Sequence, residues 1–568
     1  MSCESKPWLK NYDKHVPAEI DPELFKTTLI ELFVQVFKEF PDKVCAHFLG
    51  VDITFADLDR YSNQFADMLL NNGIKSGDVV GLSLVNTPQY LISYIGILKA
   101  GCTASGLSPL FSADELKYQL KDANATGLVC IDAAFAARIK IIAPELPNLK
   151  VIVVTNIADF LPGWKRFLGK LLKKIPSGKV TPLPNKTVIK FMDILKTFSA
   201  SFEMKKEYLN PDSTALLMYT GGTTGFPKGS ILTNRNVSSD IILMATWLQV
   251  GRGTDMAISG FPFFHIGGTA FCNMCLFQGV TQLLVPNPRD TDHICKEIAK
   301  FNPTMLVNVP SLYQMLLKNP KFKNLDFSHL KFVVSSAAPF PVESITQLED
   351  AVGKNMLIEV YGATEMSPIV LMNPRFGEKK LGTVGMPLPN VQVKLVDPAT
   401  NKEVPIGEPG EITVKGPPVM KGYLNKPEEN KKVFDEDGYF HTGDVAIMDK
   451  DGYFRIVDRV KDMIIVSGYK VYSTKVEDVL THHPAIDIIA LVGVPNPDRP
   501  GSELVKAYIQ LKPDITPSDE LKMEIINFAK EKLTPYEVPK IIEFREELPL
   551  TTVGKVYKKE LREEVKKA

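Results

Sequence analysis

The chain has 568 residues, of which 45% are hydrophobic and 23% are charged, an ordinary balance for a globular protein. This length exceeds what one hydrophobic core usually supports, so we expect at least two domains. The 66 acidic and 66 basic residues cancel, which argues against nucleic acid as a partner. The seven cysteines are scattered, and no hydrophobic leader or membrane-length apolar run is visible, so we expect a cytoplasmic protein.

Helical and strand patterns alternate through the first 440 residues, as in layered α/β folds. Apolar residues recur at helical spacing over 57–70, and continuous apolar runs at 79–85 and 127–131 predict buried strands. Short strands with glycine and proline turns then indicate a small barrel-like subdomain, and we place them at 382–385, 391–395 and 410–414.

A compact α/β pattern resumes after residue 462, with helices predicted at 473–480 and 518–533 and strands at 488–492 and 504–510. We therefore predict an α/β protein with a large multi-layer N-terminal domain that includes the barrel-like subdomain. A small α/β C-terminal domain follows, hinged just after Arg459. The predicted domains are residues 1–459 and 460–568.

A basic amphipathic segment interrupts the first domain. From Trp164 to Lys190 there are eight basic residues and no acidic one. One face of a helix over 164–175 is apolar, and the rest of it carries Lys165, Arg166, Lys170, Lys173 and Lys174. Such a helix can lie on the anionic inner surface of a membrane as a peripheral contact, or it can pack on its own domain; both interpretations stay open.

The most informative stretch runs from Tyr219 to Gly229 and follows an apolar run at 215–218 that predicts a buried strand. It is rich in glycine and threonine and contains one lysine, Lys228. Glycine lets backbone N–H groups turn toward an anion, threonine adds hydroxyl donors, and lysine adds a positive charge. The stretch therefore predicts a phosphate-binding loop. It is not a Walker A loop, because Pro227 precedes the lysine and Gly229 follows it.

Six further blocks follow in order, and together with this loop they resemble the signature motifs of the adenylate-forming enzymes. That superfamily contains acyl-CoA synthetases, peptide-synthetase adenylation domains and beetle luciferases. The likeness extends from about Thr54 to Lys555. The blocks span residues 261–265, 335–339, 361–365, 439–444, 458–462 and 549–555.

The resemblance implies that ATP activates a carboxylate through attack on its α-phosphate, loss of pyrophosphate and formation of an acyl-adenylate. Lys228 and the loop would hold the β- and γ-phosphates, and Thr364 and Glu365 would offer a hydroxyl to phosphate and a carboxylate to Mg²⁺. The catalytic residues would be Lys555, Thr364, Glu365 and Lys228. The residues expected to bind ATP and AMP are Thr220, Gly221, Gly222, Thr223, Thr224, Gly225, Lys228, Ala337, Ala338, Pro339, Tyr361, Gly362, Ala363, Thr364, Asp444, Arg459 and Lys555.

Within that set the resemblance implies individual roles. Tyr361 would present a flat face to adenine, beside the small-residue wall of 337–339. Asp444 and Arg459 would share the ribose hydroxyls. Lys555 matches the C-terminal catalytic lysine of the family, and the residues around it carry no independent signal for that role.

The resemblance also explains why a small C-terminal domain exists. The domain would be mobile and rotate about Lys461, so that Lys555 serves adenylation and a second face serves thioester formation with coenzyme A (CoA). After rotation Gly468, Tyr469 and Lys470 would face the acyl-adenylate. Gly468 would let pantetheine pass close to the backbone, and Lys470 would meet a phosphate of CoA.

The acyl pocket is expected at His265, Ile266, Gly267 and Gly268. Peptide-synthetase adenylation domains usually place an aspartate after a phenylalanine here, to pair with the substrate's ammonium, whereas this chain has Phe264-His265. Because a buried unpaired ammonium is costly, α-amino acids are disfavoured. The small apolar residues after His265 suit a hydrocarbon substrate, although His265 can also be explained as a core histidine.

We therefore predict an ATP-dependent acyl-CoA synthetase for a medium- or long-chain fatty acid, with ATP and CoA as co-substrates and Mg²⁺ as the metal. A CoA ligase for a cyclic or aromatic acid is the alternative within this class. A catalytically silent nucleotide-binding protein is the alternative outside it, and ATP–pyrophosphate exchange separates the two. The expected partners are a small carboxylic acid, ATP and CoA, with no nucleic acid; a homodimer is left open.

Overall fold

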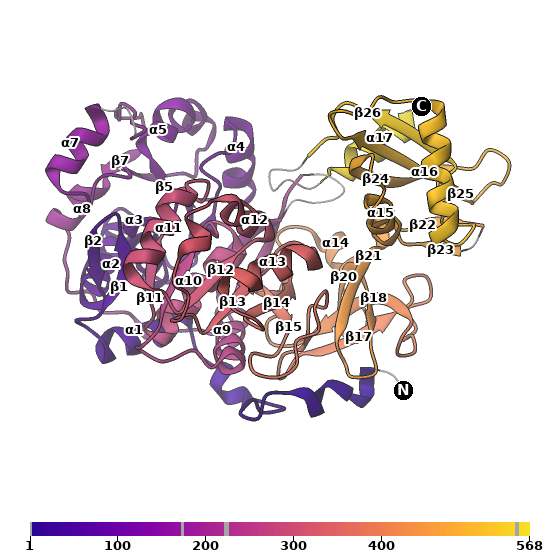
Figure 1. Ribbon diagram of the computed structural model, residues 1–568. Helices are drawn as coiled ribbons and strands as arrows, with labels where there is room; N and C mark the ends of the chain where they lie inside the picture. Colours follow the sequence, from indigo (N-terminus) through magenta and orange to yellow (C-terminus); the bar gives the residue numbers. More distant parts are fainter. Residues whose placement is uncertain (1–2, 172–174, 221–225, 468, 551–555, 568) are drawn as a thin grey trace. The chain divides into compact units, whose positions relative to one another are not determined.

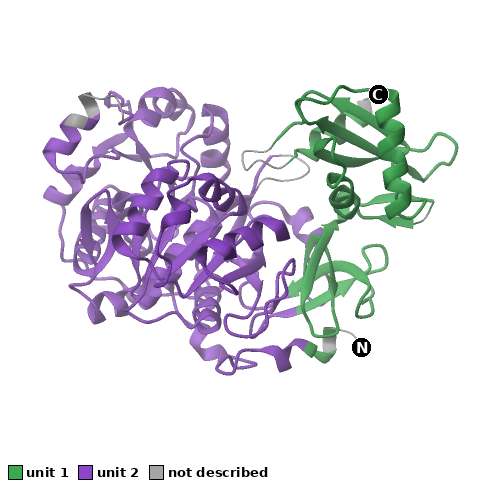
Figure 2. Cartoon of the chain, in the orientation of Figure 1, with its two compact units in different colours: residues 1–7, 393–414, 439–568 green, residues 8–392, 415–438 purple. Residues whose placement is uncertain are grey.

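The computed structural model describes residues 3–171, 175–220, 226–467, 469–550 and 556–567 (Figure 1). Its internal contacts divide the chain into two compact units (Figure 2). The larger unit comprises Trp8–Gln392 and Lys415–Gly438, and the smaller unit comprises Met1–Pro7, Val393–Val414 and Tyr439–Ala568. The four-stranded sheet near residue 400 thus groups with the C-terminal residues, and the boundary at 459 stays a prediction.

Two largely parallel sheets form the larger unit. In spatial order, the nine-stranded sheet contains β16 (Met386–Pro387), β15 (Ile369–Met372), β14 (Leu357–Gly362), β13 (Phe332–Ser335), β12 (Met305–Asn308), β10 (Met256–Ser259), β11 (Thr281–Leu284), β1 (Val44–Phe48) and β2 (Val51–Thr54). The eight-stranded sheet contains β19 (Gly422–Tyr423), β9 (Lys228–Thr233), β8 (Thr214–Thr220), β4 (Thr103–Gly106), β3 (Val79–Ser83), β5 (Gly127–Ile131), β6 (Val151–Thr155) and β7 (Thr187–Lys190).

Helices cover these sheets. They are α1 (Leu29–Glu39), α2 (Phe55–Asn71), α3 (Pro88–Lys99), α4 (Ala113–Asp122), α5 (Asp132–Ala134), α6 (Lys140–Ile142), α7 (Gly163–Leu171), α8 (Phe191–Thr197), α9 (Asn234–Leu248), α10 (Ile266–Gln278), α11 (Thr291–Phe301), α12 (Pro310–Lys318), α13 (Val342–Val352) and α14 (Pro427–Val433).

Each sheet shares a hydrophobic core with its helices. On the nine-stranded sheet, α11, α12 and α13 pack on β10–β14 around the fully buried Tyr313. On the eight-stranded sheet, α4, α6 and the π-helical turn Phe135–Ile139 pack on β5 and β6 around Phe135. The predicted helix at 57–70 is α2, which begins with a capping box between Thr54 and Asp57. The mixed α/β class predicted from the sequence is confirmed.

The described residues of the smaller unit form three sheets. The first is β17 (Gln392–Val396), β18 (Pro409–Lys415), β20 (Phe440–Met448) and β21 (Phe454–Arg459); the second is β22 (Ile464–Val466) and β23 (Tyr469–Val471); the third is β24 (Ile486–Pro495), β25 (Glu503–Leu511) and β26 (Ile541–Arg545). Its helices are α15 (Ser473–Thr481), α16 (Asp519–Lys532) and α17 (Lys558–Lys567).

One predicted strand is wrong. Residues 382–385 form no strand, because Gly382 and Gly385 adopt φ values of 76° and 79°, outside the extended range. The next two residues form β16, which pairs with β15 of the larger unit's nine-stranded sheet. The strands predicted at 391–395 and 410–414 are confirmed as β17 and β18.

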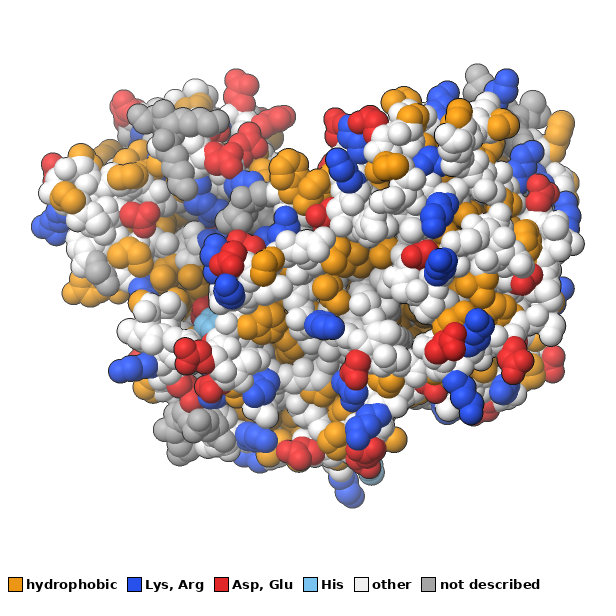
Figure 3. Space-filling model, turned by 180° about the vertical axis from the view of Figure 1, so that it is seen from behind, with side chains coloured by type: hydrophobic (Ala, Val, Ile, Leu, Met, Phe, Trp, Pro, Cys, Tyr) orange, Lys and Arg blue, Asp and Glu red, His pale blue; other side chains and the backbone are white. Residues whose placement is uncertain are grey.

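The charged surface and the cysteines agree with what the composition indicates, a balanced charge and no disulfide framework. Acidic and basic side chains are intermixed on the face drawn in Figure 3. All seven cysteines are buried free thiols. Among the residues that the structure describes, no helix is long and apolar enough to cross a membrane.

Candidate active site

The predicted phosphate loop connects two antiparallel strands of the eight-stranded sheet. Thr220 ends β8, Lys228 begins β9, and the two residues are direct cross-strand partners. The loop therefore leaves and re-enters the sheet at one pair of neighbouring positions. Its central residues, Gly221, Gly222, Thr223, Thr224 and Gly225, lie outside the described residues.

Helix α4 holds both ends of this loop. At the first end, the Tyr219 hydroxyl donates to Oδ2 of Asp122 at 2.7 Å. At the second end, the Tyr118 hydroxyl donates to the carbonyl of Pro227 at 3.0 Å, and its ring stacks on Phe226 with 4.9 Å between centroids. The loop thus starts and finishes at positions fixed by one helix.

Lys228 is the charged residue of the loop, and its ammonium is already engaged. Its Nζ lies 2.6 Å from Oε2 of Glu429 and 5.0 Å from the ring centroid of Tyr423. The hydrogen bond from Lys228 lowers the pKa of Glu429, so this carboxylate is ionised near neutral pH. Glu429 and Tyr423 were not predicted from the sequence, because neither lies in one of the motifs described above.

Glu365 contacts the same tyrosine. The Tyr423 hydroxyl donates to Oε1 of Glu365 at 2.7 Å, and the backbone N–H of Met420 donates to the Glu365 carbonyl at 2.8 Å. Thr364 and Glu365 form a short turn directly after β14. The structure thus brings Lys228 and Glu365 to one aromatic side chain, with Lys228 over its ring and Glu365 at its hydroxyl.

The carboxylate of Glu365 fits the metal expected from the sequence. Glu365 is half-buried, and its Oε2 makes no hydrogen bond to any residue that the structure describes. Mg²⁺ is usually held by one or two carboxylates together with phosphate oxygens and water. A single carboxylate in the same cluster as a lysine predicted to bind phosphate is a donor set of that kind.

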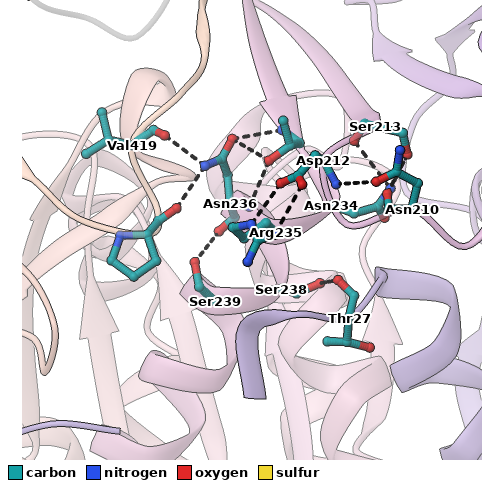
Figure 4. Close-up of polar contacts among 12 residues, drawn as sticks. Thr27, Asn210, Asp212, Ser213, Asn234, Arg235, Asn236, Ser238, Ser239 and Val419 are labelled. Atoms are coloured by element: carbon teal, nitrogen blue, oxygen red, sulfur yellow. Dashed lines mark hydrogen bonds and ion pairs between the residues drawn. The ribbon is translucent and has the colours of Figure 1, made fainter. Parts of the chain in front are cut away.

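The chain between Pro417 and Tyr423 is tied to the start of α9, as Figure 4 shows. Asn236 donates from Nδ2 to the carbonyls of Pro417 and Val419, each at 2.8 Å. Its Oδ1 accepts from the N–H and the hydroxyl of Thr233, which completes the helix cap. This network holds the segment that carries Tyr423.

The predicted adenine wall and the block after β14 lie at one edge of the nine-stranded sheet. β13 and β14 are parallel neighbours, with Ser335 opposite Glu359. Because the carboxyl ends of parallel strands meet at one edge, 336–339 and 361–364 emerge side by side. Ala337 has a φ of 70°, and Gly362 cannot carry a side chain, since a Cβ there would lie 1.7 Å from the Pro368 carbonyl oxygen.

The predicted acyl residues begin α10. His265 caps the helix by accepting from the Gly267 N–H at Nδ1, 3.2 Å away, and its side chain is exposed rather than buried in the core. A Cβ on Gly268 would lie 2.0 Å from the Pro262 carbonyl oxygen, which explains the glycine. Asn86, which no sequence motif indicated, holds this turn by donating to Phe261 O and accepting from Phe263 N, both at 2.8 Å.

In the smaller unit, the two residues predicted to share the ribose contact each other. Asp444 on β20 and Arg459 on β21 are cross-strand partners, and Arg459 Nε lies 3.0 Å from Oδ1 of Asp444. The carboxylate is mostly shielded, with 15% of the Asp444 side chain exposed against 54% for Arg459. The arginine therefore orients the carboxylate and remains accessible itself.

The remaining predicted residues also lie in the smaller unit. Burial, together with nearby Arg459 and Arg562, lowers the pKa of Lys461 to about 8. Tyr469 stacks on Tyr536 with 4.6 Å between centroids, and Lys470 forms an ion pair with Asp397. Two predicted residues, Gly468 and Lys555, lie outside the described residues.

Comparisons with known proteins cover almost the whole chain. The model of the AMP-binding enzyme family matches residues 33–424, and that of the AMP-binding enzyme C-terminal domain matches residues 475–555. A long-chain-fatty-acid–CoA ligase of Bacillus subtilis (strain 168) is 38% identical over 98% of both chains. One of Yersinia pestis is 37% identical over 98% of both chains.

Solved structures agree. The anthranilate CoA ligase AuaEII in complex with anthranoyl-AMP has a TM-score of 0.80 at 27% identity, covering 95% of this chain and 97% of that one. ATP-bound MatB from Rhodopseudomonas palustris has a TM-score of 0.78 at 27% identity, covering 94% of this chain and 99% of that one. On this evidence the chain belongs to the AMP-binding enzyme family.

Proposed function

We propose that this protein is an ATP-dependent acyl-CoA synthetase that activates a medium- or long-chain fatty acid. The carboxylate attacks the α-phosphate of ATP, pyrophosphate leaves, and the resulting acyl-adenylate is attacked by the thiol of CoA, releasing AMP. The observation that carries this proposal is the shared contact of Lys228 and Glu365 with Tyr423. A cation for phosphate and a carboxylate for metal therefore belong to one cluster.

In adenylation the negative charge shifts toward the departing pyrophosphate. Lys228, with the backbone and hydroxyls of 220–225, neutralises the β- and γ-phosphates. Glu365 would hold Mg²⁺, which when bound supplies positive charge to the phosphate oxygens. Thr364 donates its hydroxyl to phosphate. Lys555 stabilises the transferring group at the α-phosphate.

Separate residues position the adenine base and the ribose of the nucleoside. Tyr361 lies against adenine, and Ala337, Ala338 and Pro339 let the base approach closely because their side chains are small. Asp444 accepts hydrogen bonds from the ribose hydroxyls, since its carboxylate is held in orientation by Arg459. Arg459 keeps enough exposure to contact the ribose as well.

Thioester formation uses a second arrangement of the same chain. The domains are residues 1–459 and 460–568, with the hinge at Lys461. Rotation there withdraws Lys555 and presents Gly468, Tyr469 and Lys470 to the acyl-adenylate. Lys470 pairs with Asp397 in the structure, so a phosphate of CoA would replace this carboxylate as the partner of the ammonium.

The fatty acid is the substrate that best fits two observations. Both long-chain-fatty-acid–CoA ligases described above are similar to this chain over nearly its full length. The turn after Phe264 has no carboxylate for an ammonium, and it presents His265, the buried Ile266, Gly267 and Gly268. A hydrocarbon chain meets no charged group along that turn.

A CoA ligase for a cyclic or aromatic acid is the second candidate, favoured by the likeness to the anthranilate CoA ligase AuaEII. Pyrophosphate release with hexanoate, octanoate, palmitate, oleate, benzoate and anthranilate separates the two. We expect the highest kcat/KM among the fatty acids from octanoate upward. A higher value for benzoate or anthranilate would establish the second candidate, and the variant Glu365→Gln controls for contaminating ATPases.

Peripheral membrane contact through 164–175 is a further part of the proposal. Trp164 and Phe167 on α7 are 63% and 66% exposed, unusual for large apolar side chains, and Lys165 and Arg166 lie between them in the sequence. Lys165 also donates to the Leu49 carbonyl at 2.8 Å, which anchors one end of the helix to its own unit. A helix fixed at one side and apolar on another suits delivery of a lipid-soluble acid.

A further inference from the structure

Helix α14 brings to the phosphate loop a carboxylate that the proposed reaction does not use. Glu429 lies in its first turn, and Oε2 is 2.6 Å from Nζ of Lys228. The lysine side chain is 17% exposed and that of Glu429 is 32% exposed, so the pair is partly shielded from water. Its other oxygen, Oε1, lies 3.3 Å from Nζ of Lys432.

Backbone pairing holds Glu429 in this place. β19 pairs antiparallel with β9, with Tyr423 opposite Ser230, and the Leu424 N–H donates to the Gly229 carbonyl at 2.8 Å. Asn430 then closes α14 on the strand, accepting from the Tyr423 N–H at 2.7 Å and donating to the Tyr423 carbonyl at 3.1 Å. Glu429 therefore faces Lys228 through a rigid connection.

This arrangement conflicts with a triphosphate on Lys228. The ammonium has three donors, but a carboxylate within hydrogen-bond distance neutralises it and repels an incoming polyanion. ATP must therefore break the Lys228–Glu429 pair to reach the lysine. Departure of pyrophosphate lets the pair form again.

We propose, given the proposed function, that Glu429 is a positioning residue of the phosphate site that acts through Lys228. In the nucleotide-free enzyme it holds the ammonium beside β9 and keeps this partly shielded cation paired. When polyphosphate binds, the ion pair between Glu429 and Lys228 breaks. When pyrophosphate leaves, the ion pair forms again, and this competition for the lysine weakens the binding of pyrophosphate.

The test is direct binding of MgATP and of pyrophosphate to Glu429→Gln by titration calorimetry. Because the amide keeps the shape and removes the charge, both dissociation constants should fall roughly two- to fivefold, the range expected for loss of one partly exposed ion pair. KM for ATP should fall with them, and kcat should not rise, because pyrophosphate leaves more slowly. Glu429→Asp keeps the charge and should return both constants toward those of the wild type.

Glu428→Gln is the matched control. Glu428 precedes Glu429 on the same helix but pairs with Lys431 at 2.9 Å, and 76% of its side chain is exposed. Its removal changes the charge of the helix equally and should leave both dissociation constants unchanged. An equal fall in this control would reduce the effect to general electrostatics and overturn the proposal.

A second background isolates the role of Lys228. In Lys228→Gln, the further change Glu429→Gln should have little effect on MgATP binding, because no ammonium remains to be released. An undiminished effect there, or unchanged or weaker binding in the folded single variant, rejects the proposal. Should Glu429→Gln fail to fold, the same binding measurements are made on Glu429→Ala, and the same changes in the two dissociation constants are expected. A protein that binds ATP as expected but releases no pyrophosphate with any acid contradicts the proposed function instead.

Discussion

Arg459 orients Asp444 across a strand pair: its Nε lies 3.0 Å from Oδ1 of Asp444, and the two residues are direct partners in the β20–β21 register. Antiparallel pairing sets both the distance and the direction of the contact. The ribose site proposed here is therefore built on rigid strands, although Asp444 follows Gly443, whose φ of 73° marks an irregular position within β20.

The first prediction concerns this pair. Asp444→Asn should raise the dissociation constant for ATP by roughly tenfold or more, because a hydrogen bond to a charged acceptor is worth about 1.5–3 kcal/mol. Calorimetric titration with MgATP measures it. Arg455→Gln, an exposed residue on the same strand β21, is the control and should bind as the wild type does. Equal affinity in Asp444→Asn would remove Asp444 from the nucleotide site.

The second prediction separates the two half-reactions. Lys555→Ala should slow acyl-adenylate formation by roughly 10²–10³-fold, the usual cost of losing one transition-state electrostatic group. Thioester formation from supplied acyl-AMP should be nearly unchanged, because rotation withdraws Lys555 from that step. Lys540→Ala, an exposed lysine of the same domain, serves as the control. Equal losses in both half-reactions would contradict the assigned rotation.

The third prediction tests the hinge. Lys461 lies in a short turn at 460–462, and its carbonyl accepts from Nη1 of Arg562 at 3.4 Å. Lys461→Pro keeps this carbonyl but fixes φ, so rotation should be restricted while ATP binding persists. Pyrophosphate release should survive better than transfer to CoA, and Lys461→Ala should retain both steps. Normal transfer in a folded proline variant would place the hinge elsewhere.

The fourth prediction concerns pH and stability. Burial, with the nearby charge of Glu349, raises the pKa of Glu359 from 4.5 to about 7. Its folded pKa thus exceeds its unfolded pKa, so the stability it contributes is complete below about pH 4.5 and declines as pH rises through about 7. The decline amounts to at most about 3 kcal/mol.

Glu359→Gln should remove that decline, because the amide stays neutral and keeps an acceptor for the N–H of Gly382, which donates to Glu359 at 3.1 Å. Urea unfolding at several pH values measures the free energy of unfolding. The variant should show a flatter curve than the wild type between about pH 5 and 8. Glu343→Gln on the exposed side of α13 should keep the wild-type curve. An unchanged slope in Glu359→Gln would show that Glu359 is ionised in the fold.

The fifth prediction concerns the membrane. Replacing Lys165, Arg166, Lys170, Lys173 and Lys174 with glutamine should abolish binding to anionic vesicles, since each basic residue near such a surface contributes about 1 kcal/mol. Trp164→Ser with Phe167→Ser should also weaken binding, whereas Leu110→Ser, at a residue 81% exposed elsewhere, should not. Vesicle sedimentation measures binding. A wild type that stays in solution would leave α7 as an ordinary surface helix.

Much of the fold was predictable because local patterns of apolar residues indicate which segments are buried. Gly127–Ile131 is a strand with the predicted bounds, since a short continuous apolar run suits a strand of a parallel sheet that is covered on both faces. The error at 382–385 has the opposite cause. The adjacent β-branched residues Thr383 and Val384 resemble a strand, but the glycines on either side of them adopt positive φ and turn the chain, and no local pattern distinguishes the two cases.

The candidate site divides in the same way. From the residues alone, glycine, threonine and lysine at short spacing predicted a phosphate site at Lys228, whereas Glu365, Asp444 and Arg459 were predicted through the resemblance to the adenylate-forming enzymes. Only the tertiary structure showed that Tyr423 joins Lys228 to Glu365 and that Glu429 pairs with Lys228. An ion pair between residues 201 positions apart depends on the pairing of β19 with β9. Strand pairing at such separation is decided by the packing of the whole sheet, because the charges of Lys228 and Glu429 favour contact with any opposite charge and carry no information about which one lies near.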